Sequence, residues 1–466
     1  MIDLAAPRPR PLGPPVRARA EPVVRPWRLL LLSCVALAAL SLLFTNEPTY
    51  DPWAWLIWGR EIVHGNLDTF SGPSWKPLPV FFTTPFALFG AAAPSLWLIV
   101  ARAGGFLAIA LSYRLAARLA GPAAGVIAGA ALVLAESFLY NFARGYSEAL
   151  MVALCLWAVE RHLDHRPRDA FAFGVGASLV RPEIWPLLGL YGIGLVAVRW
   201  RREGRPPWPD IALVAGGGIA VLALWFVPEH IGSGDLLRAA SRARRANLNS
   251  PLYAAHPFVE VFKRSVGVVA PPVSLAALYA AVVAHRRGNR VALALALIVA
   301  GLMLLVAGMT QAGYAENLRY VALPAALVCV LGGVGWVWLA AASRPVALVL
   351  ALISIPLLVT WYGRLHESID KVKLEARQYH TITAAIARAG GPAAIKACGD
   401  VYTGPFQTQA LAWHLRVHEE DVKIFPSGPG TTVTPSYSAL ARDPRYPPVV
   451  RTRYWVVGSS CKGRLR

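Results

Sequence analysis

Long apolar runs alternate with short polar gaps over roughly the first three quarters of the chain. An α-helix needs about 20 apolar residues to cross a bilayer, and most of the runs approach this length. The runs that we interpret as membrane helices are 29–44, 95–119, 121–140, 149–159, 171–180, 184–198, 211–227, 266–284, 291–309, 320–341 and 346–362. The pattern therefore predicts an α-helical polytopic membrane protein with about eleven crossings.

The charges in the gaps predict which side of the membrane each gap faces. Basic residues gather in every second gap, at Arg114 and Arg118, 161–168, 199–205 and 285–290. Because short cytoplasmic loops carry an excess of Lys and Arg, we place these gaps inside, the N-terminus inside and the C-terminus outside. Residues 1–28, rich in Arg and Pro, then form a disordered basic cytoplasmic arm. The run 29–44 lacks a small-residue cleavage site, so we expect an uncleaved anchor.

Two stretches do not fit a simple crossing. The apolar stretch 78–89 is short, and counting it as a crossing would place Arg114 and Arg118 outside, so we interpret it as a half-helix in the outer leaflet. The runs 171–180 and 184–198 are also short. We expect them to form a hairpin that bends at Arg181-Pro182-Glu183 near the outer face, because Pro182 lacks a backbone donor.

From residue 363 onward the composition changes to that of a small soluble domain. Residues 367–388 and 406–418 are predicted to be helical, and 393–402, 422–425 and 454–458 to be strands. We therefore divide the chain into the basic arm 1–28, a transmembrane domain 29–362 with its first external loop at 46–94, and an external α/β domain 363–466. Cys398 and Cys461 lie in that domain, and both a disulfide and two free thiols are compatible with the sequence.

Composition excludes several functional classes. Of the 466 residues, 56% are apolar and only 15% are charged, against roughly a quarter in soluble domains. The net charge of +20 sits mainly in the cytoplasmic gaps, so it indicates orientation and not a nucleic-acid partner. The sequence shows no Gly-rich phosphate loop, which disfavours a cytosolic nucleotide-dependent enzyme.

Residues with catalytic potential collect in the gaps that face outside. The first external loop contains Asp51, a Trp-rich segment from Trp53 to His64, and Trp75-Lys76-Pro77-Leu78-Pro79. Later external gaps contain Arg144 to Glu148, and Asn317-Leu318-Arg319-Tyr320. A carboxylate beside the membrane, followed by aromatic residues and cations, is typical of a site at the lipid–water boundary.

These external gaps resemble those of the GT-C class of glycosyltransferases, which includes protein O-mannosyltransferases and lipid A aminoarabinose transferases. The motifs agree in their order along the chain and in the side of the membrane that they face. The resemblance covers about 29–341. The class shows an Asp soon after the first helix, an amphipathic helix, a Gly-rich turn and a Lys-Pro-Pro-Leu motif. Here Pro52 follows Asp51, where the class often has a second acidic residue, and the motif is altered to Lys76-Pro77-Leu78-Pro79.

The resemblance implies transfer of a hexose or pentose from a polyprenyl-phosphate donor to a glycan, lipid or protein acceptor, outside a bacterial cytoplasmic membrane. Asp51 would be the general base, and Lys76, Arg144 and Arg319 would bind the phosphate. Glu148 or Glu61 would supply a second carboxylate. The further candidates for substrate binding are Trp55, Trp75, Arg181, Glu183 and Tyr320. No cofactor is implied with certainty, and a divalent metal, as in the oligosaccharyltransferase relatives, stays an open alternative.

Structural interpretations stand beside these functional ones. Asp51 could cap a helix that begins at Pro52, and Arg181 and Glu183 could form a structural ion pair. Trp53, Trp55, Trp58 and Trp75 are interpreted first as interface anchors and second as surfaces for sugars. A transporter or flippase of lipid-linked glycan is the alternative function. The sugar, the acceptor and the stereochemical outcome do not follow from the sequence.

Overall fold

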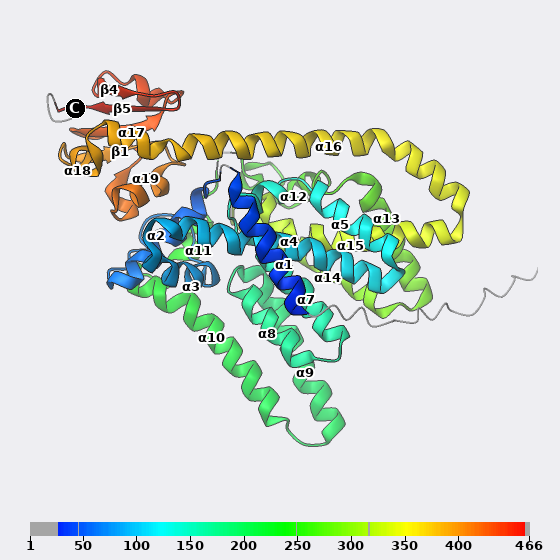
Figure 1. Ribbon diagram of the computed structural model, residues 1–466. Coiled ribbons are helices and arrows are strands. Elements are labelled where there is room, and N and C mark those ends of the chain that lie inside the picture. The colour runs from blue at the N-terminus through cyan, green and yellow to red at the C-terminus, as the bar shows by residue number, and fades with distance from the viewer. Residues whose placement is uncertain (1–26, 45, 248, 316, 462–466) are drawn as a thin grey trace, which may run out of the picture.

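The computed structural model describes residues 27–44, 46–247, 249–315 and 317–461 (Figure 1). The predicted basic arm 1–28 lies outside these residues except for Trp27 and Arg28, which begin the first helix. The chain folds into a bundle of helices with a small domain at one end of it.

The helices of the bundle correspond to the predicted apolar runs. Their bounds are α1 (Trp27–Leu40), α4 (Ala93–Ala120), α5 (Pro122–Leu134), α7 (Glu148–Leu163), α8 (Pro167–Ser178), α9 (Trp185–Glu203), α10 (Trp208–Ser233), α13 (Pro271–Arg287), α14 (Arg290–Gln311), α15 (Ala322–Ala342) and α16 (Arg344–His380). Within the described residues, five helical stretches are long and apolar enough to cross a membrane: 77–120, 208–233, 290–311, 318–342 and 344–388. The chain is a multi-pass membrane protein, and the count of about eleven crossings stays a prediction.

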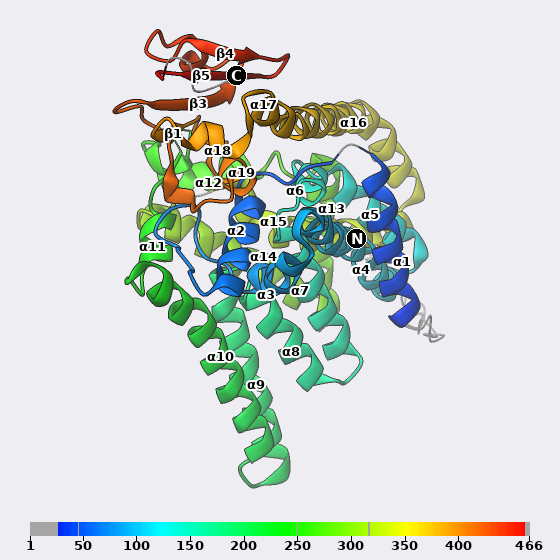
Figure 2. The same cartoon turned by 60° about the vertical axis from the view of Figure 1, so that its left-hand side comes forward.

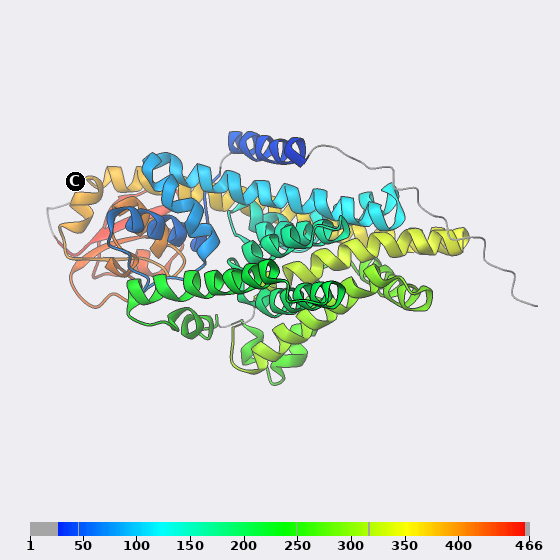
Figure 3. The same cartoon turned by 90° about the horizontal axis from the view of Figure 1, so that it is seen from below.

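Chain breakers set the ends of these helices where the predicted cytoplasmic gaps begin. The last turn of α9 contains Arg201 and Arg202 and ends at Gly204, and the last turn of α13 contains basic residues and ends at Gly288. Both glycines have positive φ, a conformation that other residues adopt only with strain. In Figure 3 the α15–α16 turn and the C-terminal domain lie at opposite ends of the molecule, in agreement with opposite membrane sides.

Close packing of small residues holds the centre of the bundle together. α15 contains Gly332, Gly333 and Gly335. A Cβ at Gly335 would overlap the carbonyl oxygen of Ala276 in α13, and one at Gly333 would overlap that of Ala124 in α5. Such backbone approach is how membrane helices gain packing energy, because lipid tails give no hydrophobic preference for helix–helix contact.

Short helices fill the outer side of the bundle: α2 (Tyr50–His64), α3 (Pro77–Phe86), α6 (Phe138–Ala143), α11 (Arg238–Ala243) and α12 (Pro257–Ser265). α2 packs closely on α3, since a Cβ at Gly59 would meet the Thr83 carbonyl and the Thr83 hydroxyl donates to the Trp55 carbonyl at 2.6 Å. The predicted hairpin is confirmed as α8 and α9, which are joined by a 3₁₀ turn at Pro182–Ile184.

The small domain lies at the end of α16 and packs against α2 on the outer side of the bundle. α16 has 37 residues, or about 55 Å, whereas the hydrocarbon core is about 30 Å thick. Its last turns therefore project beyond the membrane, and Figures 1 and 2 show the domain at that end. α16 continues without a break past residue 363, the predicted start of the C-terminal domain, and ends at His380.

The domain contains α17 (Ile382–Arg388), α18 (Gly391–Lys396), α19 (Thr408–Leu415) and one mixed sheet. The sheet consists of β1 (Asp400–Tyr402), β2 (Val422–Lys423), β3 (Gly430–Pro435), β4 (Pro448–Arg451) and β5 (Trp455–Ser459), in the order β2-β1-β3-β5-β4. β1 pairs parallel to β2 and β3, with Tyr402 beside Thr432, and β5 runs antiparallel to β3 and β4.

One strand prediction was wrong in extent. The stretch 393–402 was expected to be a strand, but its first part belongs to α18 and only Asp400–Tyr402 joins the sheet. Pro392 near the start of α18 and two alanines after it favour a helical turn over a strand. The strands β3 and β4 were not predicted.

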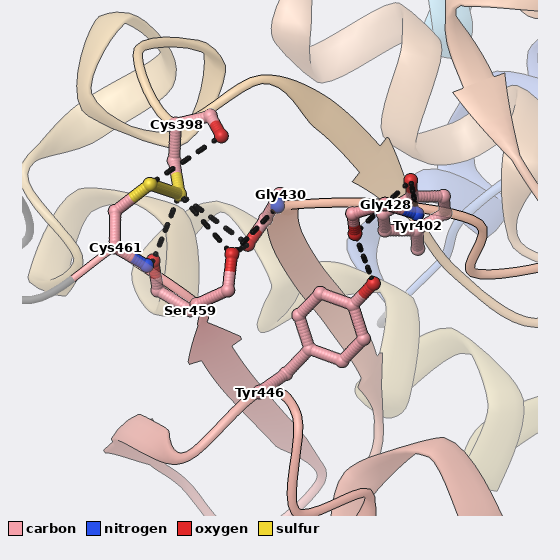
Figure 4. Close-up of a disulfide and its surroundings, with 8 residues drawn as sticks. Cys398, Tyr402, Gly428, Gly430, Tyr446, Ser459 and Cys461 are labelled. Atoms are coloured by element: carbon pink, nitrogen blue, oxygen red, sulfur yellow. Dashed lines mark hydrogen bonds between the residues drawn. A yellow bond between two sulfur atoms is a disulfide. The ribbon is translucent and has the colours of Figure 1, made fainter.

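A disulfide joins Cys398, just before β1, to Cys461, just after β5, with 5.8 Å between the Cα atoms (Figure 4). In the same view Tyr446 donates a hydrogen bond to the Gly428 carbonyl. The alternative of two free thiols is therefore wrong. Because disulfides persist in oxidising compartments, the bond agrees with the predicted outer position of the domain.

Candidate functional site

Three carboxylates and three cations from separate segments meet on the predicted outer side of the bundle. They are Asp51, Lys76, Glu148, Arg181, Glu183 and Arg319. All six belong to the site that the sequence predicts. The side chains are 1–16% exposed, so their mutual contacts replace most of the contacts with water.

Asp51 lies in the first turn of α2 and pairs with Arg319. An Arg319 Nη1 nitrogen donates to Asp51 Oδ2 at 2.8 Å, and the guanidinium lies over the Tyr146 ring, 4.0 Å from its centroid. Thr49, not Asp51, is the N-cap residue of α2. The interpretation of Asp51 as a helix cap is therefore wrong, because its carboxylate is directed to a cation 268 residues away in the sequence.

Glu148 is the hub of the cluster. As the first residue of α7 it accepts from Lys76 at 2.9 Å and from Arg181 at 3.3 Å, and Arg319 lies 3.8 Å away. These contacts use Oε1, whereas Oε2 has no hydrogen-bond partner. A cavity of about 20 Å³ reaches Glu148, which is space for about one water molecule.

Arg181 and Glu183 close the cluster on the side of the α8–α9 bend. The predicted ion pair is confirmed, with 2.9 Å between Arg181 Nη2 and Glu183 Oε1. The Arg181 guanidinium also stacks on Tyr320, 3.7 Å from the ring centroid. On the other side Lys76 lies over Trp55, 5.1 Å from its centroid. Aromatic faces stabilise these cations without neutralising them.

The balance of charge in the cluster bears on what it can bind. Three negative and three positive groups already pair with one another, so a divalent cation would have to displace Lys or Arg from each carboxylate. Among the residues that the structure describes, no group of three or more His, Cys, Asp or Glu side chains is arranged to hold a metal ion. The side chains present do not fit a divalent metal. An anion could instead recruit the cations, with Arg offering bidentate contact and Lys a point contact.

Two predicted site residues lie outside the cluster. The Arg144 side chain is buried beside Glu375, with 3.6 Å between Nη2 and Oε2, and lies 5.4 Å from the Tyr379 ring centroid. Its backbone carbonyl accepts from Thr49 N at 3.1 Å and so positions the start of α2. Trp75 donates through Nε1 to the Leu224 carbonyl at 3.0 Å and packs on Trp58.

The Trp side chains of the first loop do not anchor it at the membrane interface. Trp53, Trp55, Trp58 and Trp75 are at most 2% exposed and pack in the protein core. The interpretation as interface anchors is wrong for these rings, because α3, α4 and the C-terminal domain cover them. Trp53, for example, packs on Trp413 and His414 of α19.

Sequence reasoning missed Tyr146 and the contacts between α2 and the C-terminal domain. Glu61 Oε1 lies 2.7 Å from His418 Nδ1, and Arg60 donates to the Val417 carbonyl at 2.7 Å. Tyr146 lies in a predicted external gap, so its membrane side could have identified it as a candidate site residue. The contacts to the C-terminal domain join residues more than 350 positions apart, and no local pattern indicates them.

Comparison with known proteins agrees with this architecture at the level of the fold. Neither a protein-family model nor a curated protein matches the chain. ArnT from Cupriavidus metallidurans bound to undecaprenyl phosphate is similar in structure, with 14% identity, a TM-score of 0.57, and coverage of 94% of this chain and 98% of that one. The apo state of the same ArnT gives 15% identity and a TM-score of 0.56 with equal coverage.

AglB from Archaeoglobus fulgidus, in complex with an inhibitory peptide and a dolichol-phosphate, matches at 12% identity with a TM-score of 0.47, over 89% of this chain and 71% of that one. ArnT and AglB are GT-C membrane glycosyltransferases. On the ArnT match, which covers nearly the whole of both chains, this protein has the GT-C glycosyltransferase fold.

Proposed function

We propose that the protein is a glycosyltransferase that moves a sugar from a polyprenyl-phosphate donor to an acceptor hydroxyl on the outer side of the membrane. One observation carries the proposal. In a GT-C fold, a carboxylate in the first external loop is held by an Arg that can also contact phosphate, within a buried cluster of three cations. The ArnT structure with undecaprenyl phosphate supports the donor class.

The chemistry follows from the pairing of Asp51 with Arg319. An acceptor oxygen attacks the anomeric carbon, the bond from that carbon to the phosphate oxygen breaks, and polyprenyl phosphate leaves with the bonding electrons. The acceptor proton passes to Asp51, the general base. A donor phosphate that recruits Arg319 would release Asp51 for this role, while Lys76 and Arg181 stabilise the charge that develops on the phosphate.

Glu148 holds those cations in place before the donor arrives. Its carboxylate contacts Lys76, Arg181 and Arg319, so the three cations stay close together although they repel one another. This arrangement is prepared before the reaction, and such preorganisation is the main source of electrostatic catalysis. In this proposal Glu148 is a positioning residue and Asp51 touches the reacting atoms.

The experiment is a transfer assay with purified protein in lipid. A panel of radiolabelled polyprenyl-phosphate sugars is offered with a membrane acceptor extract, and wild type is compared with Asp51→Asn. We expect the variant to retain donor binding and to lose transfer by about 100-fold or more. Asp235→Asn is the matched control, because Asp235 is an exposed residue of the outer side that accepts from the Leu237 amide.

Three results are decisive. Normal transfer by Asp51→Asn would remove Asp51 as the base. Transfer lost equally in Asp235→Asn would point to a general effect of external charge. If wild type binds the donors but transfers none of the sugars, the glycosyltransferase proposal fails and a transporter of lipid-linked glycan gains support.

A further inference from the structure

Exposed aromatic side chains stand at one edge of the C-terminal sheet, in the segments that follow β1 and β3. β1 and β3 run parallel, so their carboxyl ends meet at the same edge. The loop after β1 presents Phe406, which is 58% exposed, and the turn after β3 presents Tyr437, which is 73% exposed. The apolar surface of a ring is unfavourably exposed to water, so exposed rings that gather at one place indicate a binding surface.

The topology of the sheet independently marks the same edge. β1 is flanked by β2 on one side and β3 on the other, and the chain passes from β1 to β2 before it returns to β3. The connection that leaves β1 leads to β2 on one side of the sheet, and the connection that leaves β3 leads to β4 on the other side. The carboxyl ends of β1 and β3 therefore form a topological switch point. Ligands of open α/β sheets bind in the crevice at such a point.

This edge is fixed next to Asp51. Trp455 Nε1 donates to the Gln378 carbonyl at 2.8 Å, which ties the sheet to the end of α16, and the Tyr379 hydroxyl donates to the Phe406 carbonyl at 2.9 Å. The Phe406 ring meets the Tyr50 ring edge to face at 6.4 Å. Tyr50 is the residue before Asp51, so the aromatic edge continues directly into the first turn of α2.

The surroundings favour an uncharged, hydroxyl-rich occupant. Two sets of ionic groups near the edge are already paired, Glu47 with His380 at 3.0 Å and Arg144 with Glu375 at 3.6 Å. The projection of α16 holds the edge beyond the hydrocarbon, where a lipid chain would remain in water. Pyranose and furanose rings present C–H faces to aromatic rings and hydroxyls to water.

We propose that Phe406 and Tyr437, with Tyr50 beside them, bind the acceptor, and that the acceptor is a neutral carbohydrate whose terminal hydroxyl reaches Asp51. The inference rests on the proposed transferase function and names its acceptor class. The aromatic edge orients the glycan, whereas the buried cluster handles the donor phosphate. Donor binding and acceptor binding are therefore separable by mutation.

The test uses the full-length protein in lipid nanodiscs with two binding measurements. Tetrasaccharides of mannose, arabinose, galactose and glucose are titrated as acceptor probes, and undecaprenyl phosphate is titrated separately. We expect wild type to bind at least one tetrasaccharide, and Phe406→Ala with Tyr437→Ala to weaken that binding by about tenfold or more. Undecaprenyl phosphate binding should be unchanged.

Two further variants test whether the aromatic rings themselves, at these two positions, are what tetrasaccharide binding requires. Phe406→Tyr with Tyr437→Phe retains both rings and should restore tetrasaccharide binding. Tyr253→Ala removes a ring that is 61% exposed elsewhere on the outer side, and it should have no effect. In the transfer assay the double Ala variant should raise the acceptor KM and leave kcat nearly unchanged.

Specific results would overturn the inference. It fails if no tetrasaccharide binds, if binding is equal in the double Ala variant, or if a peptide or lipid acceptor alone depends on these rings. Loss of undecaprenyl phosphate binding in Arg319→Ala, with tetrasaccharide binding retained, would support the division into two sites. Absence of undecaprenyl phosphate binding in wild type would count against the transferase function itself, whatever the tetrasaccharides do.

Discussion

At the scale of single residues, Glu148 and Asp51 should respond differently to loss of charge. Glu148 contacts three cations in a buried place, and removing one member of a buried ionic network costs roughly 3–5 kcal/mol. Glu148→Gln should therefore lower the melting temperature and weaken undecaprenyl phosphate binding. Asp51→Asn removes a single contact to Arg319 and should mainly lower transfer. Thermal unfolding and donor titration of both variants check this, and equal melting temperatures would contradict it.

Glu419 should make the stability of the C-terminal domain depend on pH. This residue is 5% exposed and lies against Gly72 of the first loop. Burial raises its pKa from 4.5 to about 8. The folded state thus holds a proton that the unfolded state releases above pH 4.5, so the free energy of unfolding falls as the pH rises from 4.5 to about 8.

The variant Glu419→Gln tests whether the free energy of unfolding falls, and does not rise, with increasing pH. One pKa unit corresponds to about 1.4 kcal/mol, so the variant should melt at a higher temperature than wild type at pH 8.5 and at nearly the same temperature at pH 4.5. Glu367→Gln, on an exposed position of α16, is the control and should follow wild type throughout. A wild type whose melting temperature rises between pH 4.5 and 8 in parallel with that of Glu419→Gln would contradict the assignment.

At the scale of elements, the glycines of α15 set the distance to its neighbours. A Cβ at Gly333 would overlap the α5 backbone, so Gly333→Ala must push the two helices apart. Overpacking of this kind costs about 1–3 kcal/mol. Gly301→Ala in α14 is the matched control, because nothing lies within 4 Å of its Cβ. Melting of the two variants in detergent is the measurement, and equal stabilities would show that the bundle relaxes around the added methyl group.

Some helices and strands follow from the local pattern of apolar and polar residues, and others do not. The approximate positions of the membrane helices were predictable, since apolar length and basic gaps act within one element. Their ends were not, because the run 121–140 divides into α5, which ends at Leu134, and α6, and α16 extends to His380. The strand β3 was missed because Thr431, Thr432 and Thr434 are polar yet fully buried. Their burial comes from the surrounding domain, and a sequence pattern of apolar positions gives no sign of it.

For the candidate site, membrane side was the informative signal. Asp51, Lys76, Glu148 and Arg319 were selected because each lies in an outer gap, and bundle formation brings such gaps together. Arg144 satisfied the same criterion, but its side chain lies against Glu375 of α16 and outside the cluster. Membrane side predicts which end of the bundle a residue occupies, and it does not predict which neighbour the residue faces.

At the scale of the whole molecule, the disulfide provides a test of orientation. Cys398 and Cys461 are bonded, whereas Cys34, Cys155 and Cys329 are free thiols within α1, α7 and α15. If the C-terminal domain faces outside, a membrane-impermeant maleimide should label intact cells only after treatment with an impermeant reductant. Cys398→Ser with Cys461→Ser should abolish that labelling. Labelling that requires cell lysis would reverse the orientation and place Asp51 in the cytoplasm.

The same bond should hold the aromatic edge in position. It joins residues 63 positions apart, and closing a loop of that length restricts the unfolded chain by about 4 kcal/mol in the chain-entropy account. The double Ser variant should therefore melt in two steps, with the C-terminal domain first. Because the Asp51 cluster lies in the bundle, undecaprenyl phosphate binding should survive that first step, and tetrasaccharide binding at Phe406 and Tyr437 should be lost with it. Loss of both at one temperature would mean that bundle and domain unfold as a single unit.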